Sequence, residues 1–162
     1  SGYRCAILDI NTSFSASDVA TLAQFLQAGG TVLALGEHAG GNFDTADAAL
    51  NSLAAGLGAT GLSLNDDVWD SDGDEFTSAI ASSPLTAGVY QLGDNDVSSL
   101  SVTAPAQTLV YTADDSTVPL VAYQSVGSGL FVLSGDSNMF SDNNDGFYYD
   151  ADNGTFAADL CP

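Results

Sequence analysis

The apolar positions in the first part of the chain follow two different spacings. Residues 4–10 form a short, nearly continuous apolar run, which is typical of a strand buried on both faces of a parallel sheet. Apolar residues at helical spacing follow in 19–26, and Ser15 or Ser17 can cap the helix that they predict. A second apolar run over 31–36 predicts the next strand, so the pattern indicates a βαβ unit.

The rest of the chain continues this alternation less regularly. Residues 44–47 resemble a capping box with Asp in place of Glu, and a stripe of leucines ending at Leu57 predicts a second helix after it. From 61 to 96 the chain is acidic and rich in Gly, Ser and Asp, and we expect mostly loops there. Further strands are predicted at 100–102, 108–112, 118–126 and 130–134, and a last helix from about Asn153.

This order of elements predicts an α/β fold with a mainly parallel central sheet. Asp114 and Asp115, between two alternating runs, add an antiparallel hairpin extension. A length of 162 residues and a hydrophobic content of 45 % fit one domain spanning 1–162. The sequence contains no run of roughly 20 apolar residues and no basic-then-apolar leader at its start, so we expect a mature protein or a module of a larger one.

The charge of the chain is strongly one-sided. The chain has one arginine, Arg4, and no lysine, and its 21 Asp and Glu side chains bring the formal net charge to −20. Nucleic acids and acidic membrane surfaces are poor partners for such a surface, because binding them requires lysines and arginines. Self-repulsion of this size favours a saline or calcium-containing extracellular setting, and the simpler alternative is that the acidity only keeps a secreted protein soluble.

The two cysteines lie almost at the two ends of the chain. Cys5 opens the first apolar run and Cys161 is the penultimate residue, a spacing that suits neither a CxxC redox pair nor a zinc site. In an α/β domain a final helix that runs antiparallel to the strands ends at the edge where the first strand starts. We therefore expect a Cys5–Cys161 disulfide, with two buried free thiols as the alternative.

Three segments resemble the class I glutamine-amidotransferase-like superfamily, in particular its ThuA-like and related non-catalytic domains from bacterial surface and secreted proteins. They are residues 25–36, 83–89 and 126–140. The resemblance implies a flavodoxin-like three-layer sandwich, preceded in most members by one more strand and helix that another segment or chain would supply. Active members place a cysteine nucleophile on the turn after a central strand, where this chain has Glu37 and His38, so the resemblance implies no glutamine hydrolysis.

Ligands of open α/β sheets bind at the carboxyl ends of the strands. Three loops are expected to meet at this edge, one after each of the strands predicted at 4–10, 31–36 and 130–134. The candidate ligand-binding residues in these loops are Asn11, Glu37, His38, Asn42, Asp136 and Asn138. They predict a crevice for a carbohydrate or another small polar ligand.

The same edge offers a catalytic alternative. His38 is the only histidine, Glu37 or Asp136 could orient it, and Ser137 or Ser13 could act as a nucleophile. The simpler interpretation is that the acids accept backbone N–H bonds and that His38 is an exposed loop residue. The sequence contains no G-x-S-x-G elbow, so we predict no catalytic residues and keep an unrecognised hydrolase as the third hypothesis.

Acidic residues are concentrated in two loops. Asp70, Asp72 and Asp74 alternate as the first ligands of an EF-hand do, although the glycine and the bidentate Glu of that motif are out of place. Hard oxygen donors in this pattern suit Ca²⁺, so we predict these three as metal ligands, with a solvated acidic loop as the alternative. A second cluster has similar chemistry and comprises Asp142, Asp145, Asp150 and Asp152.

Four aromatic residues lie inside these acidic loops, where rings beside carboxylates could stack on sugars or else cover the edge of the core. They are Trp69, Phe147, Tyr148 and Tyr149. The first functional hypothesis is a non-catalytic structural or interaction module of a secreted or cell-surface bacterial protein, with a protein partner or self-assembly. The second is a binding domain for a carbohydrate or another small polar ligand.

Overall fold

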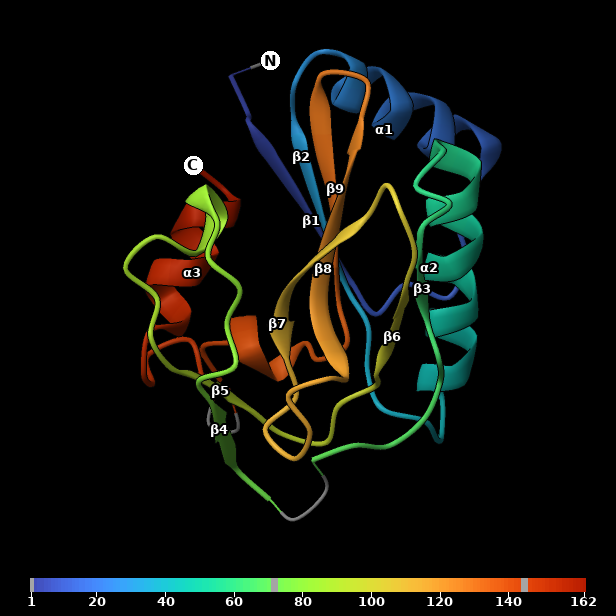
Figure 1. Ribbon diagram of the computed structural model, residues 1–162. Helices are drawn as coiled ribbons and strands as arrows, with labels where there is room; N and C mark the ends of the chain where they lie inside the picture. The colour runs from blue at the N-terminus through green and yellow to red at the C-terminus, as the bar shows by residue number, and fades with distance from the viewer. Residues whose placement is uncertain (1, 71–72, 144–145) are drawn as a thin grey trace.

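The computed structural model describes residues 2–70, 73–143 and 146–162, and a five-stranded mixed sheet runs through its centre (Figure 1). The strand order is β1 (Cys5–Asp9), β2 (Thr31–Leu35), β9 (Gly129–Ser134), β8 (Pro119–Val126) and β7 (Gln107–Tyr111). The first three strands are parallel, and β8 is antiparallel to both β9 and β7. The predicted α/β class, its parallel strands and its antiparallel hairpin are confirmed.

Helices cover both faces of this sheet. On one face lie α1 (Ala16–Gln27) and α2 (Phe43–Leu57), and on the other lies α3 (Asn153–Leu160) (Figure 1). The start of α1 is fixed by Ser15, which forms a capping box with Asp18. Gly58 ends α2 in the left-handed conformation, with φ of 88°.

The core divides at β2, where all five residues are buried. Val32 and Ala34 pack in the cluster formed with α1 and α2, whereas Leu33 and Leu35 pack in the cluster that contains Phe156 of α3. Successive side chains of a strand point to opposite faces, so one continuous apolar run supplies both halves of the core.

The region 61–96, in which the sequence predicted mostly loops, contains several short regular elements. It holds β3 (Leu62–Leu64), β4 (Glu75–Thr77), a short 3₁₀ turn η1 (Pro84–Thr86) and β5 (Leu92–Asp94). β3 pairs antiparallel with β6 (Leu100–Val102), outside the central sheet, and β4 pairs antiparallel with β5. Three-residue strands are too short to show a spacing, which is why the sequence indicated loops here.

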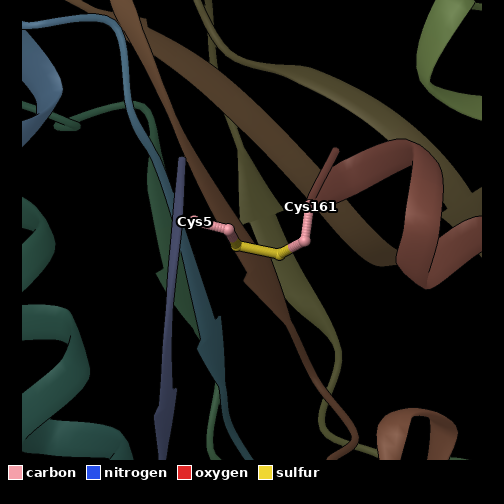
Figure 2. Close-up of a disulfide and its surroundings, with 2 residues drawn as sticks. All are labelled: Cys5 and Cys161. Atoms are coloured by element: carbon pink, nitrogen blue, oxygen red, sulfur yellow. A yellow bond between two sulfur atoms is a disulfide. The ribbon is translucent and has the colours of Figure 1, made fainter. Parts of the chain in front are cut away.

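A disulfide joins Cys5 to Cys161, as predicted, across 156 residues of sequence with a Cα–Cα distance of 5.1 Å. Figure 2 shows one sulfur coming from β1 and the other from the segment directly after α3. The last helix therefore ends beside the start of the first strand. Within the described residues no helix combines the length and apolar character that a membrane crossing requires.

Candidate functional site

A cavity of about 370 Å³ opens where β1, β2 and β9 end, the sheet edge at which the sequence predicts binding. Its wall is partly apolar and partly polar. The apolar residues are Ile7, Ile10, Leu35, Phe43 and Phe140, and the polar ones are Asp9, Glu37, Ser137, Asn138, Ser141 and Asn143. The last of the 3₁₀ turns, η2 (Asn138–Phe140), contributes two of these residues.

Glu37 is the most buried charged group of this wall, with only 5 % of its surface exposed. One carboxylate oxygen, Oε1, accepts a hydrogen bond from the Ser137 hydroxyl. The other, Oε2, lies 3.3 Å from Nδ1 of His38, whose ring packs edge-on against Phe43. Glu37 therefore lies between the serine and the histidine, and the hydroxyl contacts the carboxylate directly.

Asp136 is close to this cavity but serves the loops around it. Its side chain is completely buried, and its two oxygens accept backbone N–H bonds from Asn138 at 2.6 Å and from Asn95 at 3.2 Å. Burial, followed by the charge of Glu37, raises the pKa of Asp136 well above its usual range. Asp136 thus fixes the loop after β9 and does not line the cavity.

The other predicted binding residues lie further away. Asn11 and Ser13 line a separate cavity of about 360 Å³ against α1. Asn42 is exposed at the start of α2, and its side chain forms no capping bond with the described backbone. The structure therefore places Glu37 and Asn138 in the wall of the strand-end cavity and His38 against Glu37, and it places Asn11 and Asn42 outside the cavity.

Asp47 is a buried acid whose role the sequence did not reveal. The pattern of residues 44–47 predicted a capping box, but α2 begins at Phe43 and Asp47 points inward. Its Oδ1 accepts a hydrogen bond from the Glu37 amide at 3.2 Å, and Oδ2 has no partner among the described residues. Burial is the main reason that the pKa of Asp47 rises to about 7, and nearby Asp66 adds to it. Its place three residues before Leu50, on the apolar stripe, was the available signal.

Of the three predicted calcium ligands, the structure describes Asp70 and Asp74, and their side chains have different partners. Asp70 is buried, and its carboxylate accepts backbone N–H bonds from Ala113 at 2.8 Å and Asp114 at 3.0 Å. Asp74 is exposed and accepts a hydrogen bond from the Asn95 side chain, while Asp72 lies outside the described residues. Asp70 instead meets Glu75 and Asp114, and one ligand atom from each of these three lies within 4.8 Å of the others.

Asp94 adjoins this acidic group and was not singled out by the sequence. Burial, and after it the charges of Asp70, Glu75 and Asp114, raise the pKa of Asp94 to about 8. The residue is the last of β5, and the register of the β4–β5 pair sets it opposite Glu75. A short strand within an acidic region carried no pattern that distinguished this Asp from its exposed neighbours.

The second acidic cluster and the aromatic residues have mostly structural surroundings. Asp152 accepts backbone N–H bonds from Tyr90 and Gln91, Asp142 and Asp150 are exposed, and Asp145 lies outside the described residues. Phe147 is buried against Phe76, and the Trp69 indole donates to Asp67. Tyr149, at 79 % exposure with its ring against Tyr148, is the most solvent-exposed of the four candidate sugar-stacking aromatics.

Comparison with known proteins gives one family match and several structural likenesses. The family described as "Domain of unknown function (DUF4350)" matches residues 6–161. The N-terminal domain of mmIFT52 superposes with a TM-score of 0.72 and 20 % identity, covering 96 % of this chain and 74 % of that one. Cytoplasmic protein STM1381 from Salmonella typhimurium LT2 superposes with a TM-score of 0.68 and 16 % identity, covering 98 % of this chain and 70 % of that one. No curated protein matches the sequence.

A further likeness joins this chain to part of an enzyme. The β-galactosidase from Rahnella sp. R3 superposes with a TM-score of 0.63 and 15 % identity over 97 % of this chain but 22 % of that one. Identities this low show a shared fold alone. The predicted membership of the glutamine-amidotransferase-like superfamily is wrong, because the family match and the mmIFT52 and STM1381 likenesses point to a DUF4350-type fold.

Proposed function

The chain belongs to the DUF4350 family, and from this premise we propose that it is a non-catalytic interaction module of a secreted or cell-surface bacterial protein. We propose that the module binds a small, hydroxyl-rich ligand such as a carbohydrate. The strand-end cavity with Glu37 in its wall is the observation that carries the proposal. Its volume falls in the range of small-molecule sites, and its wall combines apolar surface with a few polar groups, as such sites do.

The chemistry of the wall suits hydroxyl groups. The Glu37 carboxylate already accepts one hydroxyl, that of Ser137, and a ligand hydroxyl can take the same kind of bond. Phe43 and Phe140 provide ring surface against which the apolar face of a sugar can pack. A phosphate or carboxylate ligand would meet like charge on Glu37 and Asp9, so a neutral ligand fits better.

The order of contacts favours binding over catalysis. A serine nucleophile needs a base at its hydroxyl and a third group that orients the base. Here the Ser137 hydroxyl donates to Glu37, and His38 contacts the opposite oxygen of that same carboxylate. The histidine therefore does not stand between the serine and the acid, which makes a hydrolase the weaker hypothesis.

Three further features of the module are part of the proposal. We propose a flavodoxin-like three-layer arrangement, which the helices on both faces of the sheet support. An extracellular location is supported by the disulfide and by the net charge of −20. Calcium is proposed as the cofactor, because the buried Asp70, with Glu75 and Asp114 beside it, offers hard oxygen donors.

Titration calorimetry with a panel of neutral mono- and oligosaccharides tests the binding proposal. We expect at least one sugar to bind wild-type protein, and Glu37→Gln to weaken it about tenfold, roughly the value of a hydrogen bond to a charged group. Asp44→Asn, which removes a carboxylate outside the cavity wall, is the matched control and should bind normally. If no sugar binds, or if Glu37→Gln binds as wild type does, the cavity is not a saccharide site.

A further inference from the structure

Asp94 is a fully buried carboxylate that receives no hydrogen bond from the part of the chain that the structure describes. Its relative exposure is 0 %, and neither Oδ1 nor Oδ2 has a donor among the described residues. Burying an ionised carboxylate without a partner is among the least favourable arrangements in a protein, so such groups are normally paired or coordinate a metal. The surroundings of Asp94 therefore lack a positive partner.

The chain itself cannot provide that partner. It contains no lysine, and its basic side chains are Arg4 and His38. Arg4 directly precedes β1, whose start lies at the end of the molecule opposite β4 and β5 (Figure 1), and His38 contacts Glu37, which lines the strand-end cavity. A cation that pairs with the ionised form of Asp94 would therefore come from solution.

Three other carboxylates lie around Asp94. Glu75 faces it across the β4–β5 pair, and oxygens of Glu75, Asp70 and Asp114 lie within 4.8 Å of one another. Opposite ligands of a bound Ca²⁺ are about 4.6–5.2 Å apart, since each oxygen is 2.3–2.6 Å from the ion, so these separations fit one ion. The two backbone N–H bonds to Asp70 hold its carboxylate in place and leave lone pairs for coordination.

We propose that Asp94, Asp70, Glu75 and Asp114 form a calcium site that joins the β4–β5 pair to the loop before β4 and to the turn between β7 and β8. Of the predicted combination of Asp70, Asp72 and Asp74, this ligand set contains Asp70 and not Asp74, and Asp72 lies outside the described residues. It rests on the proposal that calcium is the cofactor of the module but not on the strand-end cavity. Four carboxylates are a typical anionic complement for Ca²⁺, whereas Mg²⁺ retains most of its water and uses one or two.

Calcium binding is measured by titrating CaCl₂ into protein treated with EDTA, at fixed ionic strength. Terbium luminescence gives a second readout, because Trp69, the single tryptophan, is the neighbour of Asp70 in the chain and can sensitise a bound Tb³⁺. We expect CaCl₂ to bind and to raise the melting temperature more than ionic-strength-matched NaCl or MgCl₂ does. Equal effects of CaCl₂ and NaCl, or of CaCl₂ and MgCl₂, would overturn the assignment.

Variants identify the ligands. Asp94→Asn and Glu75→Gln should each lower the calcium affinity at least tenfold. Even residues that only hydrogen-bond to metal ligands typically cost about tenfold or more in affinity when they are replaced. Asp74→Asn removes a carboxylate that is exposed and adjacent in sequence, and as the matched control it should retain affinity within threefold. Wild-type affinity in Asp94→Asn overturns the site, and Glu75→Gln decides the matter if the first variant does not fold. Glu37→Gln should keep full calcium affinity, which separates this test from that of the saccharide cavity.

Discussion

Asp136 and Asp94 are both completely buried carboxylates, yet their surroundings differ in the donors that they offer. Asp136 accepts backbone N–H bonds from Asn138 and Asn95, one on each oxygen. Asp94, adjacent to Asn95 in the chain, accepts none from the described residues. The same chemical group is thus held by backbone donors in one place and, in the other, is buried without a donor from the described residues, which is why we propose it as a calcium ligand. The two acids therefore differ in their hydrogen-bond donors and not in their burial.

The largest expected effect comes from removing the satisfied member of this pair. Asp136→Ala leaves the amides of Asn138 and Asn95 without their acceptor, and each unsatisfied donor costs about 1–3 kcal/mol, so we expect the free energy of unfolding to fall by about 3 kcal/mol. Urea denaturation at pH 7 measures this. Asp136→Asn keeps an acceptor oxygen and should lose less. A loss below about 1 kcal/mol for the alanine variant would show that these two bonds contribute little.

Replacing Asp94, which has no donor among the described residues, should change the free energy of unfolding in the opposite direction. In EDTA, Asp94→Asn takes away a buried carboxyl that accepts no hydrogen bond from the described residues and is surrounded by other carboxylates, and we expect the free energy of unfolding to rise by about 1–2 kcal/mol. With a hundredfold excess of Ca²⁺ over its Kd the wild type gains about 2.7 kcal/mol, so the order of the two proteins should reverse. Denaturation curves with and without calcium measure both values. If the variant is less stable than wild type in EDTA, the carboxylate of Asp94 has favourable interactions of its own.

A third carboxylate, Asp47, lies between these extremes, because one of its oxygens has a donor and the other has none. Its pKa is raised from 3.8 to about 7 in the folded protein, so the folded state holds the proton more tightly than the unfolded state does. Its contribution to stability is therefore complete below pH 4 and is lost as the pH rises toward 7. Glu37, Asp66 and Asp44 are the charged groups that face it.

We expect Asp47→Asn to make the decline of stability between pH 4 and 7 shallower, by less than the limit of about 1.4 kcal/mol per pH unit for one group. Urea denaturation at several pH values, in EDTA, measures the two slopes. Asp150→Asn, which removes an exposed carboxylate that is not among the groups facing Asp47, is the control and should keep the wild-type slope. Identical slopes for wild type and Asp47→Asn would mean that Asp47 titrates alike in the folded and unfolded states.

The smallest effect is expected at His38. Its ring contacts Phe43 and Glu37 but remains partly exposed, so His38→Ala should change the free energy of unfolding by no more than about 0.5 kcal/mol. Thermal and urea unfolding at pH 7 measure the change. A fall of more than roughly 2 kcal/mol in the free energy of unfolding would show that the contacts of His38 with Glu37 and Phe43 stabilise the fold.

Local patterns in the sequence were enough to predict some elements and not others. The buried run of β2 and the capping serine of α1 act through neighbouring residues, and both follow from the printed sequence. The surroundings of Asp94 are formed by residues distant in sequence. Its partner in the β4–β5 register is Glu75, nineteen residues earlier in the chain, and the turn at Asp114 lies beside it. Such a group of acids is created by tertiary contacts between short strands, so no spacing along the chain marks it.

The Cys5–Cys161 bond also determines how the domain responds to mechanical load. Tension applied through the residues on either side of this pair passes from one to the other through the covalent bridge, across a Cα–Cα distance of 5.1 Å. The sheet, the cavity and the acidic group lie within the closed loop of chain and carry none of that force. Within a longer chain, such a domain would act as an inextensible link that keeps its binding surfaces intact while its neighbours are stretched.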